Sequence, residues 1–160
     1  MIDLQRLVED ARHDGVGKLV VGAVVHDGDR VLILRRSAAD DFLPGIEELP
    51  SGGVEDGEDL LGALARELAE EIGLPALPRL DPGFVASFDY VSGSGRRARQ
   101  YTFALPYDGG PITLSAEHEA HRWISRAELA ASDLTEESTR TLREFFDSGV
   151  SRRGPGSGSR

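Results

Sequence analysis

Apolar residues recur along the chain with two periods, one typical of helices and the other typical of strands. Near the N-terminus, a helical spacing predicts a short amphipathic helix, whose apolar face is formed by Leu4, Leu7, Val8 and Ala11. Residues 18–26 then form an almost continuous apolar run, which predicts a strand that is buried on both faces. Such a strand belongs in the middle of a sheet.

Two β-hairpins are predicted from paired strand-like segments. Turn residues at 27–29 connect the central strand to a return strand over 31–34. Alternating residues over 84–91 and 99–105, separated by a turn rich in Ser and Gly, predict the second hairpin. Two further strands are expected, a short one before Pro50 and a last one that contains Trp123. Together, these strands are expected to form a single sheet.

Helices are predicted to follow the last strand. Ser125 and Glu128 form a capping box, which begins a helix that ends near Ser132. Another helix is expected over 136–147, with acidic residues in its first turn. Together, the elements predict an α/β fold in which a mixed central sheet has helices on both faces.

Three segments are expected along the chain. Residues 1–16 hold the N-terminal helix, 17–148 form one domain, and 149–160 have the Gly- and Ser-rich composition of a flexible tail. The N-terminal helix is expected to pack on the domain. The alternative is a dimerisation arm, which would make the protein a homodimer.

The longest predicted helix, over 58–72, carries a concentration of negative charge. It lacks proline and is rich in Leu, Ala and Glu, and Gly73 marks its C-terminal end. A stripe that would face the core is formed by Leu61, Leu64, Leu68 and Ile72. Three glutamates at positions i, i+3 and i+4 share a different face, namely Glu67, Glu70 and Glu71.

These glutamates need a compensating charge. Like charges at this spacing repel one another, and the last turn of a helix disfavours negative charge. One interpretation is a solvated acidic surface. Because the apolar stripe anchors the helix, we favour a bound cation, and Mg²⁺ fits because it takes oxygen ligands and often bridges carboxylates to substrate phosphates. Mn²⁺ is the alternative cation. Arg66, four residues before Glu70, is expected to hold that carboxylate in position.

The stretch 52–74, GGVEDGEDLLGALARELAEEIGL, resembles the Nudix box, the signature of a family of hydrolases. The matching positions are Gly52, Glu58, Arg66, Glu67, Leu68, Glu70, Glu71, Gly73 and Leu74. The resemblance implies a Nudix-like α/β/α sandwich. In this family, the loop and helix bind divalent metal and hydrolyse a nucleoside diphosphate linked to another group. Strand and helix patterns on both sides of the box extend the resemblance to most of 18–147.

The resemblance also implies roles for individual residues. Beside Arg66, the catalytic and metal-binding residues would be Glu67, Glu70 and Glu71. Ser51 stands where many members carry a glycine whose carbonyl lies near the metal, and it is expected to supply that carbonyl. A further ligand or a general base often comes from the region ahead of a similar tryptophan. Glu117 is the candidate there, with Glu119 as the second choice, and the general base is either Glu67 or Glu117.

Four residues are candidates for contacts with a substrate. Arg35 and Arg36 follow a predicted strand and are either ordinary surface charge or contacts to phosphate. Phe88 and Tyr90 lie in the second hairpin, where they either pack in the core or stack on a nucleobase. We favour a nucleoside triphosphate that is hydrolysed to a monophosphate and pyrophosphate. ADP-ribose and dinucleoside polyphosphates are the alternative substrates, and a nucleotide-binding regulator without catalysis is the alternative of another class.

Composition and net charge limit the kinds of molecule that the protein is expected to bind. The formal net charge of -10 argues against binding to nucleic-acid polymers or anionic membranes. The absence of cysteine excludes disulfides and thiolate metal sites. We find no apolar run that would span a bilayer and no signal-peptide pattern at the N-terminus, so a cytoplasmic protein is expected. His118 and His121 are expected on the surface, because an oxygen-ligated site does not need them.

Overall fold

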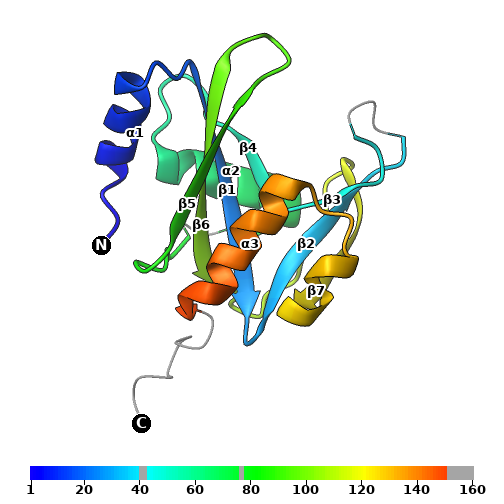
Figure 1. Ribbon diagram of the computed structural model, residues 1–160. Helices are drawn as coiled ribbons and strands as arrows, with labels where there is room; N and C mark the ends of the chain where they lie inside the picture. Colours follow the sequence, from blue (N-terminus) through cyan, green and yellow to red (C-terminus); the bar gives the residue numbers. More distant parts are fainter. Residues whose placement is uncertain (40–42, 76–77, 151–160) are drawn as a thin grey trace.

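A mixed β-sheet lies between two layers of helices in the computed structural model (Figure 1). The structure describes residues 1–39, 43–75 and 78–150, so most of the expected tail lies outside the described residues. Within the described residues the sheet has seven strands. They are β1 (Lys18–Asp27), β2 (Arg30–Arg36), β3 (Glu47–Glu48), β4 (Ser51–Gly53), β5 (Val85–Val91), β6 (Arg97–Pro106) and β7 (His118–Ser125).

The apolar strand β1 is central, as its composition predicts. One edge pairs in parallel with β6, from Lys18 opposite Ala98 to His26 opposite Pro106. The other edge is shared by two antiparallel partners, because β4 pairs with the first half of β1 and β2 pairs only with its last residues. The strands β4 and β2 therefore occupy different parts of the same edge of β1.

Helices cover both faces of the sheet, which confirms the predicted α/β fold. Helices α1 (Leu4–His13) and α2 (Leu60–Ile72) pack against one face, around Val21, Ala23 and Phe103. The 3₁₀ helix η1 (Arg126–Ala131) and α3 (Glu136–Ser148) contribute to the second core on the other face, as Figure 1 shows for α3 in front of the sheet. Within the described residues, no helix is long and apolar enough to cross a bilayer.

The local predictions are confirmed with small shifts. Both hairpins form, with β1 pairing with β2 and β5 pairing with β6. The capping box of Ser125 and Glu128 begins η1. Helix α2 begins at Leu60 rather than 58, because the Asp59 side chain accepts a hydrogen bond from the Gly62 N–H and caps it. As a result Leu60 is buried, whereas Leu61 is only partly covered.

The N-terminal helix α1 packs on its own domain. Its apolar residues Leu4, Leu7 and Val8 contact the core on the α2 side of the sheet. The Tyr101 hydroxyl, on the central strand β6, donates a hydrogen bond of 2.7 Å to the Leu7 carbonyl. This hydrogen bond gives the buried hydroxyl a partner, so it attaches the helix to the sheet in addition to the apolar packing between them.

Candidate active site

Arg66 ties the loop after β4 to helix α2. Its guanidinium donates to the Gly53 carbonyl at 2.9 Å and to both oxygens of Glu58, at 2.7 and 2.8 Å. A further hydrogen bond of 2.7 Å reaches Glu67, while Glu70 is 3.5 Å away. The hydrogen bonds from Arg66 lower the pKa of Glu58 to about 2. The planar fork of an arginine suits such a set of acceptors, so Arg66 acts as a positioning residue for the loop and for Glu67.

Glu67 lies against a glycine. Its carboxylate occupies the space where a side chain at Gly52 would stand, so a β-carbon there would collide with it. The side chain is largely covered, and burial raises the pKa of Glu67 against the opposing effect of its hydrogen bond from Arg66. The glycine of the motif therefore serves to bring the backbone of β4 next to this carboxylate.

Glu71 is the most deeply buried of the helix glutamates, with 5% of its surface exposed. One of its carboxylate oxygens accepts a hydrogen bond of 2.8 Å from the Ser51 N–H. Burial, followed by the charges of Glu67, Glu48 and Glu117, raises the pKa of Glu71 to about 8, although the hydrogen bond from Ser51 works in the opposite direction. A cation at this position would reverse that effect, because it favours the ionised carboxylate.

Glu70 and Glu117 stand at the exposed side of the cluster. The Glu70 side chain is 59% exposed, and its carboxylate lies 3.5 Å from the Arg66 guanidinium. Glu117 precedes β7 and lines the same cavity as Glu71, and its charge is among the causes that raise the pKa of Glu67 and Glu71. Glu119 is exposed on β7 and is outside the set of residues that line the adjoining cavity. The structure thus brings Glu117, rather than Glu119, to the helix glutamates.

A cavity of about 530 Å³ opens beside these carboxylates. Its lining includes Glu71 and Glu117 together with Phe88 and Tyr90 of β5, whose ring centroids are 6.0 Å apart. The two aromatic residues share one face of β5, where burial declines from Ala86 to the partly exposed Tyr90. The cavity is therefore lined by both carboxylates and aromatic rings.

The two candidate arginines are consecutive residues of β2, and their side chains point in different directions. Arg36 lines the cavity and forms an ion pair of 3.2 Å with Glu48. Arg35 donates instead to the Gly45 carbonyl at 2.6 Å and to Asp133 at 3.0 Å. Because successive side chains on a strand point to opposite faces, only Arg36 is placed to meet a ligand in this cavity.

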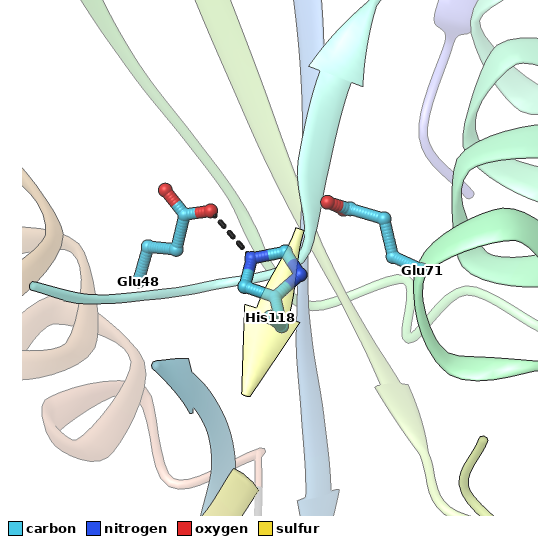
Figure 2. Close-up of side chains that lie close together, drawn as sticks. All are labelled: Glu48, Glu71 and His118. Carbon is cyan, nitrogen blue, oxygen red and sulfur yellow. Dashed lines mark hydrogen bonds and ion pairs between the residues drawn. The ribbon is translucent and has the colours of Figure 1, made fainter. Parts of the chain in front are cut away.

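Two residues of the site were missed by the sequence pattern, Glu48 and His118. The expectation that His118 lies on the surface is wrong, since its side chain is fully buried and lies 2.7 Å from Glu48. With Glu71 they form a group whose potential ligand atoms all lie within 4.8 Å of one another (Figure 2). The only hint in the sequence is that both residues lie close to predicted site residues, since Glu48 is three positions before Ser51 and His118 directly follows Glu117.

The acidic cluster on a loop and helix, set on a mixed sheet with helices on both faces, is the arrangement that the resemblance to the Nudix box predicts. The family model for the NUDIX domain matches residues 17–145. The chain therefore belongs to the Nudix family.

Relatives and solved structures agree with this family. An uncharacterized Nudix hydrolase, YfcD of Salmonella typhi, is 42% identical over 124 residues, which are 74% of this chain and 65% of the relative. The chain thus spans slightly less than two thirds of the length of that relative. A nucleoside triphosphatase, NudI of Escherichia coli, is 26% identical and covers 79% of this chain and 94% of its own length.

Among solved structures, the ORF135 protein of E. coli has a TM-score of 0.68 at 27% identity, covering 87% of this chain and 94% of its own. An Ap4A hydrolase of C. elegans has a TM-score of 0.66 at 21% identity, covering 80% and 94% of the two chains. That second likeness is one of fold.

The raised pKa of Glu71 predicts how stability depends on pH. The folded state holds this proton up to about pH 8, whereas a free glutamate loses it near 4.5. The metal-free protein should therefore lose stability between these values as the pH rises, by at most about 1.4 kcal/mol per pH unit. Thermal unfolding in a chelator at pH 6 and pH 8 measures this loss. Glu71→Gln should show a smaller loss, and equal losses in both proteins would rule out Glu71 as its source.

Proposed function

We propose that this protein is a divalent-metal-dependent pyrophosphohydrolase, and that its substrate is a nucleoside triphosphate converted to a monophosphate and pyrophosphate. The observation that carries this proposal is the cavity that joins the carboxylates of Glu71 and Glu117 to the aromatic pair Phe88 and Tyr90. The carboxylates and the aromatic rings of its lining suit the two halves of a nucleotide, a phosphate chain with its cation and a flat base.

The donor set fits a divalent cation. Glu67, Glu70, Glu71 and Glu117 supply carboxylate oxygens, and the charge of Glu117 acts on both Glu67 and Glu71. Magnesium takes such oxygen ligands and commonly bridges them to substrate phosphates, with Mn²⁺ as the alternative. When bound, the cation would neutralise the phosphates and lower the pKa of a water molecule. The raised pKa values of Glu67 and Glu71 are what an acidic cluster shows without that positive charge.

The side chains of the site would then orient and activate the attacking water. Glu67, held by Arg66 at 2.7 Å, or the exposed Glu117 takes the proton as the water oxygen attacks phosphorus. The bond between phosphorus and the bridging oxygen breaks, and that oxygen leaves with the departing phosphate group. General-base assistance of this kind is worth about two to four powers of ten in rate.

Positive side chains and aromatic rings would bind the rest of the nucleotide. Arg36 and Lys18 line the cavity and supply charge for phosphate oxygens. Phe88 and the partly exposed Tyr90 offer ring faces for the base. The similarity to the nucleoside triphosphatase NudI, which covers 94% of that relative, supports the choice of a triphosphate over ADP-ribose and dinucleoside polyphosphates.

A substrate panel tests this proposal. Nucleoside triphosphates, ADP-ribose and dinucleoside polyphosphates are incubated with the full chain and Mg²⁺, and the products are separated by ion-exchange chromatography. We expect monophosphate and pyrophosphate from a triphosphate and no turnover in a chelator. Preferential cleavage of ADP-ribose or of a dinucleoside polyphosphate would make that compound, rather than a triphosphate, the substrate. Nucleotide binding without cleavage of any member would instead favour a regulator.

Glu117→Gln is expected to lower kcat by about a hundredfold, because the amide can neither accept a proton nor add its charge to the cluster. The matched control is Glu119→Gln, two residues away, whose exposed side chain lies outside the cavity lining. Steady-state kinetics with the best substrate of the panel measures both. Equal, near-normal rates in the two variants would remove Glu117 from the site.

A further inference from the structure

His118 is buried in an arrangement that leaves one ring nitrogen without a partner. Its side chain has no exposed surface, and its Nε2 lies 2.7 Å from a carboxylate oxygen of Glu48. Among the described residues, none forms a hydrogen bond with the other nitrogen, Nδ1. A buried polar atom without a partner costs free energy, so such an atom calls for an explanation.

The contact with Glu48 determines what Nδ1 offers. An ionised carboxylate only accepts hydrogen bonds, so the imidazole donates to Glu48 through Nε2. In the neutral ring, Nδ1 then carries a lone pair. A carboxylate that holds one ring nitrogen of a histidine is the usual partner of a metal-binding histidine, because it fixes the tautomer and the orientation of the ring.

The free nitrogen lies on the side of the ring nearer a second carboxylate. Figure 2 shows the imidazole between Glu48 and Glu71, with one ring nitrogen bonded to Glu48 and the other on the side of Glu71. Ligand atoms from all three residues lie within 4.8 Å of one another. The Ser51 N–H engages one oxygen of Glu71 and holds this side chain in place, while a carboxylate retains further lone pairs for a cation. The Glu71 carboxylate and the lone pair of Nδ1 thus lie close together, while Glu48 engages the other nitrogen of the ring.

We infer that His118 Nδ1 and the Glu71 carboxylate together bind a divalent transition-metal cation, with Glu48 as the positioning residue that orients the imidazole. The nitrogen ligand decides the class of metal. Magnesium favours oxygen ligands, whereas imidazole suits transition metals such as zinc, iron and nickel, and manganese accepts both kinds. The inference rests on the proposed function in that Glu71 belongs to the acidic cluster.

The test detects nitrogen ligation directly and does not use hydrolysis. The untagged full chain is loaded with Mn²⁺, and pulsed electron paramagnetic resonance measures the coupling of the electron spin to ¹⁴N. We expect imidazole coupling in the unmodified protein and its loss in His118→Asn. The matched control is His121→Asn on the same strand, whose exposed ring should leave the signal unchanged.

Affinity supplies a second readout. Removing an outer partner of a metal-binding histidine typically costs about 10–100-fold in metal affinity. We therefore expect Glu48→Gln to weaken Mn²⁺ binding by about tenfold while the ¹⁴N coupling persists, and this variant serves if His118→Asn does not fold. Mg²⁺ binding to His118→Asn should change less than Mn²⁺ binding.

The failures of the two proposals are distinguishable. Mn²⁺ bound by the unmodified protein without imidazole coupling would overturn the nitrogen ligand and leave the metal-dependent hydrolase intact. Coupling that survives in His118→Asn would likewise overturn the assignment. No binding of Mn²⁺ or Mg²⁺ at all would overturn both this inference and the proposed function.

Discussion

Glu70→Gln is expected to lower the kcat of metal-dependent hydrolysis by at least about a hundredfold while the protein stays folded. The loss follows because an amide lacks the negative charge that stabilises a divalent cation, and such stabilisation is worth several kcal/mol of transition-state energy. Folding should be unaffected, since the side chain is 59% exposed and its nearest cation, Arg66, keeps closer partners.

Kinetics at saturating Mg²⁺, combined with thermal unfolding, measures the effect of Glu70→Gln. The control is Glu144→Gln, an exposed glutamate on α3, which should retain normal activity. A Glu70 variant with near-normal turnover and unchanged dependence on metal concentration would contradict its place in the cation site.

Gly52→Ala is expected to reduce kcat by about a hundredfold, although it adds only a methyl group. The new β-carbon would overlap the carboxylate of Glu67, so this side chain must leave the position in which Arg66 holds it. A displacement of about 1 Å in a catalytic group commonly costs two powers of ten in rate. Steady-state kinetics measures the loss, and a crystal structure of the variant should show Glu67 moved.

The neighbouring residue provides a matched control for this substitution. A β-carbon at Gly53 would meet only the end of the Lys18 side chain, at an ordinary contact distance of 3.7 Å. Gly53→Ala should therefore retain most of the activity, since it keeps the carbonyl that accepts from Arg66. Similar losses in both variants would point to the flexibility of the loop rather than to Glu67.

Much of the fold follows from local patterns that tertiary packing reinforces. Residues 18–26 are apolar on both faces, and the structure buries both faces of β1. Helix α2 ends at Gly73 because the chain there adopts a positive φ of 76, which glycine permits. The helix begins at Leu60 rather than at Glu58, because the cap formed by Asp59 outweighs the helical preference of Glu58.

The site was less predictable where it depends on which strands meet. The pair Arg35 and Arg36 looks equivalent in sequence, yet the pleat of β2 sends one toward Asp133 and the other into the cavity. The burial of His118 depends on β7 pairing with β2, a contact between distant segments. No local period records such pairing, so neither the buried imidazole nor its partner Glu48 was recognised.

The contacts of Arg66 are all short in sequence, since its partners Gly53, Glu58 and Glu67 lie 13, 8 and 1 residues away. By contrast, the cavity lining combines Glu71 of α2 and residues of β4 with residues from distant segments, among them Phe88 and Tyr90 of β5 and Glu117 before β7. The contacts of Arg66 are therefore local to the loop and α2, whereas the lining of the cavity depends on segments far apart in the sequence. Under the proposed function, substitutions at Phe88 or Tyr90 are expected to change the nucleobase preference while leaving the contacts of Arg66 intact, so directed evolution of specificity should begin on β5.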